Sequence, residues 1–310
     1  MRIVFWGTPG FAHTVLKGLL DADREVVGVV TQPDRPAGRG RKLQPPPVKT
    51  AAERAGITVL QPERPRGDEF MESLRAMEAD ISVVAAYGHI LRAEVLDTPP
   101  LGSFNVHASL LPELRGAAPV NWAIIRGHPD TGVTIMRMVE ALDAGPMLLQ
   151  AHCDLPCDIT AGVLTERLAG LGAETLLEAL ALIENGEADE VRQDDEAATY
   201  APKLKAEDAR LDWRLSAAEL SRWIRGTDPT PGAWSELSGL RVRIFKPRVI
   251  DAAAEGEPGE VLAADARTGL EVSTGSGRLS IGEVQPAGKR RMETTEWIRG
   301  RGITLGQRFS

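Results

Sequence analysis

The first part of the chain alternates short apolar runs with amphipathic stretches. Six runs, rich in Val, Ile and other strand formers, are typical of buried strands: Ile3–Trp6, Val26–Thr31, Thr58–Leu60, Ile81–Ala86, Phe104–His107 and Val133–Met136. Helical periodicity lies between them, over Phe11–Leu20, Val48–Ala55 and Asp68–Met77. Alternating strands and helices, with strands that are apolar almost throughout, predict an α/β fold with a doubly wound, mostly parallel sheet.

The second half of the chain changes character at a long predicted helix, Ala161–Asn185, which Gly186 ends. Residues 187–209 are polar and acidic, which predicts a surface linker. A short helix, Ala217–Arg225, then precedes brief alternating segments with Gly and Pro between them, and these predict strands: Leu240–Phe245, Gly259–Leu262, Gly269–Ser273 and Leu279–Val284. We therefore expect a first domain over 1–186, a linker over 187–209, and a small OB-like β-barrel over 210–310.

Length and composition agree with this division. The chain has 310 residues, more than one domain usually holds, and its apolar runs are too short to cross a bilayer. The only cysteines are Cys153 and Cys157, which excludes a disulfide framework and favours a reducing compartment, the cytoplasm. With His152 they could be imagined as zinc ligands, but no second pair of ligands lies nearby.

Charge is spread unevenly along the chain. Residues 1–209 hold 20 Lys and Arg against 31 Asp and Glu, a net charge of −11, whereas residues 210–310 hold 16 against 13, a net charge of +3. A mildly basic second part beside an acidic first part raises the question of a polyanionic partner, although charge alone is weak evidence.

The first strand is followed by the turn Gly7-Thr8-Pro9-Gly10-Phe11. A glycine turn between strand and helix is the usual place of a nucleotide site, but the spacing G-x-G-x-x-G is missing. We interpret it as a tight turn with Pro near the helix start, and we expect no dinucleotide cofactor.

The chemistry centres on Asn105, His107 and Asp143. Asn105 and His107 are two residues apart on a predicted strand, so their side chains lie on the same face near its end. Asp143 follows the strand Val133–Met136, and it can reach His107 if that strand neighbours Phe104–His107. An amide, an imidazole and a carboxylate together can stabilise an oxyanion and move protons, as acyl transfer requires. From spacing alone, a structural histidine at a strand end is the simpler alternative.

Longer sequence motifs decide between a catalytic and a structural role for His107. The sequence Asn105-Val-His107-Ala-Ser109-Leu110-Leu111-Pro112, with the later loop residue Asp143, resembles the folate-dependent formyltransferase family. Further similar segments lie along nearly the whole chain: Phe5–Pro9, Thr31–Gly40, Ala86–Gly88, Arg115–Pro119, Thr131–Met136, Ile159-Thr160, Thr199–Ala201 and Gln285–Lys289. The agreement in order and identity makes this resemblance specific.

The resemblance implies a donor, 10-formyltetrahydrofolate, and an acceptor, the α-amino group of methionine on initiator tRNA. It implies that Asn105 orients the formyl oxygen and that His107 stabilises the oxyanion and protonates the leaving nitrogen. It also implies that Asp143 orients the imidazole and favours its protonated form. The turn Ser109, Leu110, Leu111 and Pro112 would line the folate pocket. No metal ion is required, and we expect a monomer.

A glycine- and proline-rich loop, Pro33–Lys49, is the second feature that carries function. It holds five basic residues against one acid, Asp34: Arg35, Arg39, Arg41, Lys42 and Lys49. The resemblance implies that Arg35, Arg39, Arg41 and Lys42 bind tRNA phosphates. The alternative is an exposed loop whose charges are merely solvated.

The second domain carries two basic stretches, Arg241–Arg248 and Lys289–Arg291. Arg241 and Arg243 would share one face of a strand until the alternation slips at Phe245, and such a face could steer RNA. Ordinary charged strand edges explain the pattern equally well. Two departures from the family pattern, Glu113-Leu114 and Asp228–Pro231, put local contacts near the folate pocket and the tRNA in doubt, but neither touches the three catalytic candidates.

Two rival functions remain at this stage. A formyltransferase of the same family could act on the amine of a nucleotide sugar or a purine precursor, and it would need neither the basic loop nor a basic barrel face. An RNA-binding protein without catalysis is the other, but it would not need Asn, His and Asp together.

Overall fold

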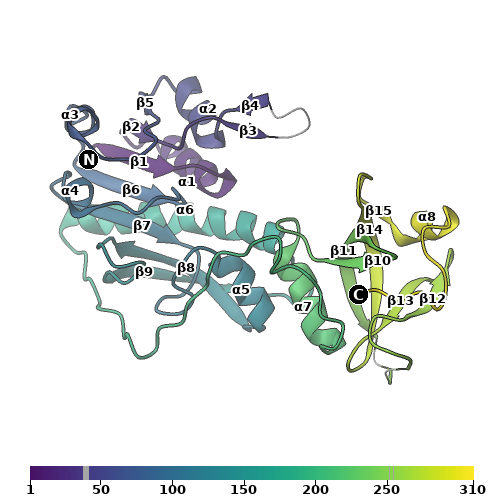
Figure 1. Ribbon diagram of the computed structural model, residues 1–310. Coiled ribbons are helices and arrows are strands. Elements are labelled where there is room, and N and C mark those ends of the chain that lie inside the picture. Colours follow the sequence, from purple (N-terminus) through teal and green to yellow (C-terminus); the bar gives the residue numbers. More distant parts are fainter. Residues whose placement is uncertain (38–41, 251, 254) are drawn as a thin grey trace. The chain divides into compact units, whose positions relative to one another are not determined.

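The computed structural model describes residues 1–37, 42–250, 252–253 and 255–310. Its contacts form two compact units (Figure 1). The first consists of Met1–Pro119, Asp130–Asp154 and Thr165–Ala201, and the second of Val120–Pro129, Leu155–Leu164 and Pro202–Ser310. Two short segments, Val120–Pro129 and Leu155–Leu164, therefore belong to the second unit although residues on both sides of them belong to the first.

The first unit is built on a seven-stranded sheet with the order β5-β2-β1-β6-β7-β8-β9. Its strands are β1 (Ile3–Gly7), β2 (Val26–Val30), β5 (Val59–Leu60), β6 (Ile81–Ala85), β7 (Ser103–His107), β8 (Asp130–Arg137) and β9 (Met147–Asp154). The strands from β5 to β7 are parallel, and β8 and β9 continue the sheet with antiparallel pairings. The predicted α/β class and mostly parallel sheet are confirmed.

Helices cover both faces of this sheet: α1 (Gly10–Asp21), α2 (Pro47–Arg54), α3 (Asp68–Arg75), α4 (Ala93–Leu96) and the part of α6 (Ala161–Asn185) that belongs to this unit. Side chains of α3 and α4 pack on the face that presents Val4 and Trp6. α1 and α6 approach each other where Gly18 meets Ala173, since a Cβ on Gly18 would lie 2.7 Å from the Ala173 Cβ. Small residues thus let two helices pack closely.

The turn after β1 has a structural reason for its glycine. A Cβ on Gly7 would lie 2.5 Å from the Cβ of Ala12 and 2.9 Å from the carbonyl oxygen of Ala85. Pro9 caps α1, where its missing N–H costs nothing. Gly7 is therefore needed for close packing of strand, helix and neighbouring strand.

Three strands of the first unit were not predicted, and two of them lie in the basic loop. β3 (Arg35–Ala37) and β4 (Lys42–Gln44) pair as a separate antiparallel ribbon within the basic loop. Arg35, Pro36 and all residues of β4 are exposed, so no buried apolar run signals these strands. β9 escaped prediction for a similar reason, since it is an edge strand whose exposure alternates.

The second unit contains α5 (Pro119–Arg126), α7 (Ala217–Thr227), α8 (Thr294–Arg299) and an antiparallel sheet with the order β10-β11-β14-β13-β12, with β15 paired to β14. Its strands are β10 (Trp234–Leu237), β11 (Leu240–Ile250), β12 (Val261–Asp265), β13 (Gly269–Ser273), β14 (Arg278–Pro286) and β15 (Met292–Glu293). α7 begins with a capping box, in which Ser216 and Glu219 each bond the other's backbone N–H. Leu220 and Ile224 of this helix reach the apolar core.

The C-terminal residues join the two edges of this sheet. Glu236 of β10 exchanges backbone hydrogen bonds with Ser310, of 3.1 and 2.9 Å. On the other edge Phe309 donates to Gly259 over 2.9 Å, and Val261 of β12 donates to Gln307 over 2.8 Å. An antiparallel C-terminal domain is therefore confirmed, and joined edges are what a barrel needs. The closed barrel stays a prediction.

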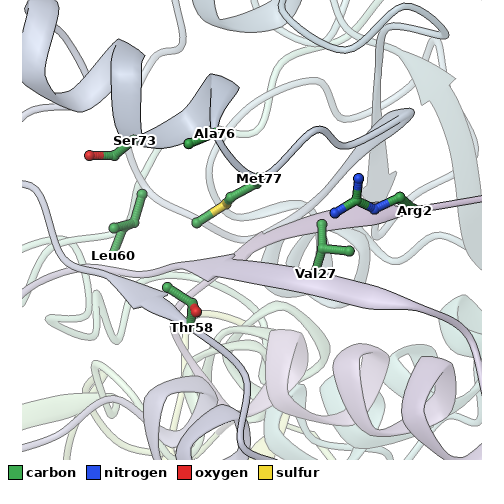
Figure 2. A pocket seen from close by; sticks show the side chains of 7 residues that line it. All are labelled: Arg2, Val27, Thr58, Leu60, Ser73, Ala76 and Met77. Atoms are coloured by element: carbon green, nitrogen blue, oxygen red, sulfur yellow. The ribbon is translucent and has the colours of Figure 1, made fainter.

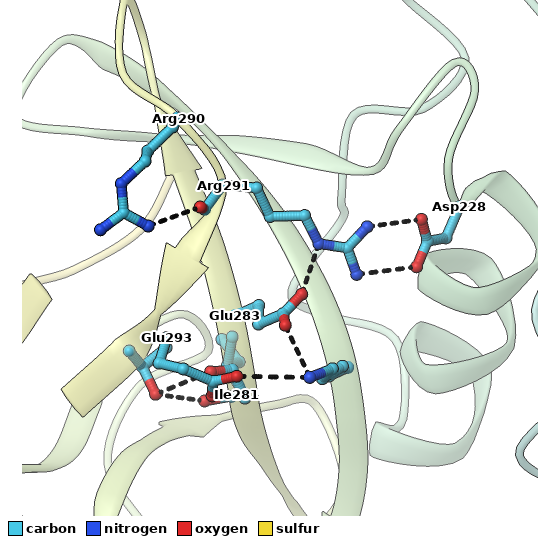
Figure 3. A network of polar contacts seen from close by, with 9 residues as sticks. Asp228, Ile281, Glu283, Arg290, Arg291 and Glu293 are labelled. Atoms are coloured by element: carbon cyan, nitrogen blue, oxygen red, sulfur yellow. Dashed lines mark hydrogen bonds and ion pairs between the residues drawn. The ribbon is translucent and has the colours of Figure 1, made fainter. Parts of the chain in front are cut away.

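β11 is irregular at the point where the sequence pattern slips. Its pairing with β14 passes from Phe245 opposite Glu283 to Pro247 opposite Ile281, and Lys246 between them has φ of +50°. The register of the two strands is the same on both sides of Lys246, whose side chain is exposed and pairs with Glu283 at 2.6 Å. Figure 3 shows the network around Glu283, which Arg291 extends to Asp228 with hydrogen bonds of 2.9 and 3.2 Å. Across the residues that the structure describes, no helix is both long and apolar enough to span a membrane.

Candidate active site

Asn105 and His107 lie on β7, which forms the last parallel pairing of the sheet together with β6. Val84 of β6 is the register partner of Asn105, and Thr134 of β8 is that of His107. Residues in register point to the same face, so Asn105 and His107 share a face with Val84 and Trp6. β7 and β8 are neighbours, paired antiparallel, so the condition under which Asp143 can reach His107 is met.

Asp143 lies beside His107. Its Oδ1 is 3.8 Å from the Nδ1 of His107, and both side chains are largely buried, with 12% and 5% of their surfaces exposed. The other ring nitrogen, Nε2, lies 3.1 Å from the carbonyl oxygen of Leu114. A carbonyl only accepts, so Nε2 carries a proton. Because both neighbours are acceptors, only the protonated ring can offer an N–H to each of them.

The backbone of Asp143 is in an unusual conformation. Its φ is +49°, in the left-handed region that residues with a Cβ seldom occupy. Its Oδ2 accepts a hydrogen bond of 2.8 Å from the backbone N–H of Gly116. The carboxylate is thus fixed at one oxygen, while the other faces the imidazole.

Asn105 is half-buried, and its side-chain amide has no hydrogen-bond partner within the described part of the chain. An amide that is not used by the protein can bind a polar group of a substrate. The structure therefore brings two of the three predicted catalytic residues into direct proximity, and it leaves the third on the same face with an unused donor and acceptor. Their catalytic roles stay predictions.

The turn predicted to bind folate is held by hydrogen bonds of its own. Ser109 and Leu111 are buried, and the Ser109 hydroxyl donates to the carbonyl of Glu113 over 2.6 Å. Thr134 donates to the carbonyl of Ser109 and accepts from the N–H of Leu111, over 2.7 and 3.1 Å. Leu110 and Pro112 keep part of their surface exposed. A ligand can therefore touch Leu110 and Pro112 directly, whereas Ser109 and Leu111 shape the turn.

Two further polar groups near β6 were missed from the sequence. The hydroxyl of Tyr87 and the Nε2 of His89 are buried and unpartnered within the described residues, and their rings lie 5.6 Å apart. Burial raises the pKa of Tyr87 to about 12, so its hydroxyl keeps its proton at neutral pH. Tyr87 also packs edge-on against Trp6, with 5.3 Å between ring centroids. The signals in the sequence were the family-like segment Ala86–Gly88 and the position of both residues directly after a buried strand, at the end of the sheet where ligands bind.

A pocket of about 380 Å³ lies elsewhere in this unit (Figure 2). It is lined by Arg2, Val27, Thr58, Leu60, Ser73, Ala76 and Met77. These residues lie near the beginnings of the parallel strands β1 and β2 and beside α3, opposite to the end that carries His107. The guanidinium of Arg2 is already paired, with Glu78 at 2.9 Å and Glu25 at 3.6 Å. The pocket thus contributes nothing to the site around Asn105.

The basic loop is a hairpin in the part that the structure describes. Arg35 pairs with Gln44 and position 37 with Lys42, so Arg35 and Lys42 lie on one face, and both are exposed. Lys49 is bound to Asp34 by hydrogen bonds of 2.9 and 3.0 Å. Arg39 and Arg41 lie outside the described residues. Of the predicted phosphate ligands, Arg35 and Lys42 are thus placed together on an accessible face.

Basic residues of the second unit differ in how far acids neutralise them. Arg290 is paired with Glu296, and Arg291 with Asp228 and Glu283. Arg241 stacks on Trp234 with 4.0 Å from its Cζ to the ring centroid, and Arg210 approaches the same ring at 5.5 Å. Burial lowers the pKa of Arg241, with Arg243 adding to the effect. Within the described residues neither Arg210 nor Arg241 forms an ion pair.

The two cysteines are free thiols, Cys153 half-buried in β9 and Cys157 exposed. His152, the third ligand of the imagined zinc site, instead lies 3.5 Å from Asp130. No cluster of three or more His, Cys, Asp or Glu side chains suited to a metal ion occurs in the described ranges.

Comparison with protein families agrees with the site. Residues 1–180 match the model of the formyl transferase family, and residues 203–302 match that of the formyl transferase C-terminal domain. The chain belongs to the formyl transferase family. The resemblance stated from the motifs around Asn105 and His107 is thereby confirmed.

Individual proteins of known sequence or structure show what the chain is similar to in more detail. The chain is 48% identical to the methionyl-tRNA formyltransferase of Desulfotalea psychrophila over 300 residues, which is 97% of this chain and 93% of that protein. Among solved structures, HypX from Aquifex aeolicus in complex with tetrahydrofolic acid is similar in fold, with a TM-score of 0.70 and 20% identity over 98% of this chain. The match covers 48% of HypX, so this chain spans about half of its length. A methionyl-tRNA formyltransferase from Clostridium thermocellum has a TM-score of 0.58 and 14% identity, over 81% of this chain and 95% of its own.

Proposed function

We propose that this protein transfers the formyl group of 10-formyltetrahydrofolate to the α-amino group of methionyl initiator tRNA, as a step of translation initiation. The observation that carries the proposal is the 48% identity, over almost the whole chain, to a methionyl-tRNA formyltransferase. The site agrees with it, because His107, Asp143 and the unpartnered amide of Asn105 supply the groups that acyl transfer needs.

The reaction requires two proton movements. The neutral amine attacks the formyl carbon and forms a new C–N bond, and the carbonyl electrons move to oxygen. The amine nitrogen then loses a proton, the bond between the formyl carbon and the folate nitrogen breaks, and that nitrogen gains a proton. Tetrahydrofolate and the N-formylated methionyl-tRNA are the products. An oxyanion donor and a proton carrier therefore lower the barrier most.

Each of the three residues fits one of these tasks. Asn105 orients the formyl oxygen and donates a hydrogen bond to it as negative charge develops. His107, in its protonated form, stabilises the same charge and provides the proton for the leaving nitrogen. Asp143 faces the ring with its Oδ1 and offsets its positive charge, and its fixed position beside Gly116 supports this role.

The hydrogen bond from His107 to Leu114 has a consequence for proton transfer. Nε2 is occupied by the Leu114 carbonyl, and the side chain is 5% exposed. Transfer from Nε2 therefore requires that the Glu113–Leu114 backbone move away when substrates bind. In enzymes without bound substrate, the hydrogen bonds of catalytic residues are often long, poorly aligned or made to other groups.

Polar groups that follow β6, the strand paired with β7, and the turn after β7 support a folate pocket. The unpartnered Tyr87 hydroxyl and His89 Nε2 offer polar contacts, while Leu110 and Pro112 offer apolar surface. Buried polar atoms without partners are rare, and a bound ligand satisfies them. Both donor and acceptor are substrates here, and the proposed chemistry needs no metal ion.

For the tRNA we propose two contact surfaces. The first is the hairpin face with Arg35 and Lys42, which Arg39 and Arg41 adjoin in the sequence. The second lies in the domain 210–310, whose net charge is +3 and whose Arg210 and Arg241 flank Trp234. Arginine beside an aromatic ring suits both phosphate and unstacked bases. We keep 1–186 as the catalytic domain and 187–209 as the connection, and expect a cytoplasmic monomer, which light scattering tests.

Mass spectrometry of the acceptor after reaction distinguishes this function from its rivals. The protein is incubated with 10-formyltetrahydrofolate and, separately, methionyl initiator tRNA, a nucleotide-linked amino sugar, and the amine of a purine precursor. Our proposal predicts a gain of one formyl group on methionine alone. Formylation of the sugar or the purine precursor, with none on methionine, would replace it by another reaction of the same family.

A further inference from the structure

Gln193 links the segment that follows α6 to the loop that carries Asp143. Its side-chain Nε2 donates hydrogen bonds of 2.8 Å to the carbonyl oxygen of Asp143 and 2.7 Å to that of Gly145. The bonds thus hold the backbone on both sides of residue 144. Gln193 is half-buried, although the residues around it are exposed.

The orientation of the Gln193 amide is set by a third contact. Its Oε1 accepts a hydrogen bond of 2.9 Å from the Nε of Arg115. Because the guanidinium only donates, the amide oxygen must face Arg115 and the amide nitrogen must face the two carbonyls. Arg115 itself is 3% exposed, so the fixed end of this chain of bonds is in the protein interior.

These bonds act on a backbone that needs support. Asp143 has φ of +49°, which is unfavourable for a residue with a Cβ. Gly145 is packed so closely that a Cβ there would lie 1.9 Å from the carbonyl oxygen of Arg137. A strained conformation persists only where neighbouring contacts hold it. Gln193 supplies two such contacts to this loop, one to the carbonyl of Asp143 and one to that of Gly145.

The same segment also holds the other side of the imidazole. Thr199 accepts a hydrogen bond of 2.9 Å from the N–H of Leu114 at its Oγ1, and its carbonyl accepts one of 2.9 Å from the N–H of Arg115. The carbonyl of Leu114 faces His107 Nε2. One stretch of chain, from Gln193 to Thr199, therefore anchors the Asp143 loop and Leu114, which face the two ring nitrogens of His107.

We propose that Gln193 is a positioning residue for formyl transfer. It acts by holding the Asp143 carboxylate where its Oδ1 faces the Nδ1 of His107. Residues 187–209, which the sequence predicts to be a linker, then contribute a residue that supports the active site. The inference rests on the proposed role of Asp143 in catalysis. It makes Gln193 necessary for the rate of the chemical step and not for binding either substrate.

The test compares three variants of the full chain in steady-state and single-turnover formylation of methionyl initiator tRNA. Gln193→Ala removes all three bonds. Gln193→Glu keeps an acceptor for Arg115 but removes both donors to the Asp143 loop. Glu196→Ala, an exposed residue of the same segment outside these contacts, is the matched control. Melting temperatures and KM for both substrates are measured on each.

We expect kcat to fall by about 10- to 100-fold in both Gln193 variants, since a displacement of about 1 Å costs that much, with both KM values within about twofold of the original. Glu196→Ala should keep kcat. The variant Gln193→Ala should melt as a folded protein. A purely structural role would lower stability and both affinities instead.

A double-mutant cycle separates the inference from the function on which it rests. If Gln193 acts through Asp143, Gln193→Ala should lower the single-turnover rate by less than about twofold when Asp143 is already Asn. An equal loss in both backgrounds, or an unchanged kcat in Gln193→Ala alone, overturns the inference. If Asp143→Asn itself keeps the full rate, the proposed catalytic site fails, and the inference fails with it.

Discussion

The backbone N–H of Gly116 donates a hydrogen bond of 2.8 Å to the Oδ2 of Asp143. Gly116 follows the turn at the end of β7, and Asp143 lies in the loop between β8 and β9, so the bond ties two loops over one end of the sheet. It leaves the Oδ1 of Asp143 to face His107 at 3.8 Å. The conformation of Gly116 therefore matters for the orientation of the carboxylate.

Replacing Gly116 by Ala should disturb this orientation. Gly116 has φ of +119°, and a Cβ there would lie 2.7 Å from the carbonyl oxygen of Ala201. We expect Gly116→Ala to move the N–H away from Asp143 and to lower kcat at least tenfold, measured by formylation kinetics. Gly170→Ala is the control, because a Cβ at that position in α6 meets nothing within 4 Å. Equal rates in both variants would show that the bond to Asp143 is dispensable.

Ligand-dependent melting should distinguish folate from dinucleotides. Gly7 is packed against Ala12 and Ala85, and the spacing of a pyrophosphate turn is missing, whereas Tyr87 and His89 offer unpartnered polar atoms. Tetrahydrofolate should raise the melting temperature, and NAD and NADP should leave it unchanged. A shift with NAD and none with folate would contradict the proposed donor.

The sequence predicted those parts of the site that lie on buried strands. Asn105 and His107 sit two residues apart on an apolar run, so their common face followed from strand periodicity. The position of Gln193 could not be predicted, because a polar, acidic stretch gives no periodicity and its partners are backbone carbonyls more than forty residues away. The family motifs identified Asp143, but its left-handed backbone conformation and its bond to Gly116 depend on tertiary contacts.

Exposed elements were the least predictable parts of the fold. The hairpin β3–β4 buries no described apolar side chain, and Leu43 on it is 68% exposed. Its pairing comes from backbone hydrogen bonds between the two strands, which leave little trace in the hydrophobic pattern. By contrast, the helix α6 was predicted to the residue, since its leucines line a buried face and Gly186 follows its end.

The hairpin gives a prediction about salt dependence. Arg35 and Lys42 lie on one exposed face, and each phosphate contact releases a condensed counterion. Changing both residues to Ala should weaken tRNA binding and flatten the plot of log K against log salt by about one to two units. Folate binding should not change. Leu43→Ala, on the opposite face, is the control, and an equal salt slope in both variants would mean that the basic side chains are merely solvated.

Glu283 gives a prediction about acid stability. Burial alone would raise its pKa, but hydrogen bonds from Lys246 and Arg291 outweigh burial and hold the pKa below its ordinary value of 4.5. The unfolded chain therefore takes up this proton first as the pH falls. The stabilisation is present above about pH 4.5 and is lost as the pH falls through the lower folded value.

Calorimetry of the full chain between pH 7 and pH 3 measures this effect. Glu283→Gln should lower the melting temperature of the second unit at pH 7 and reduce its further decline in acid. Glu174→Gln, an exposed glutamate of α6 outside the network, should follow the original protein. A decline in acid that is as steep in Glu283→Gln as in the original would show that this network does not set the acid limit.

The most direct test of the proposed catalytic site is the rate of formyl transfer to methionyl initiator tRNA when Asp143 is changed to Asn. The amide keeps the shape of the side chain and can still accept from Gly116, but it removes the negative charge that faces His107. Single-turnover mass spectrometry should show a rate lower by about 100-fold or more, with the dissociation constant for folate nearly unchanged, because the lost interaction belongs to the transition state. A near-normal rate in Asp143→Asn would contradict the assignment of Asn105, His107 and Asp143 as the residues that transfer the formyl group.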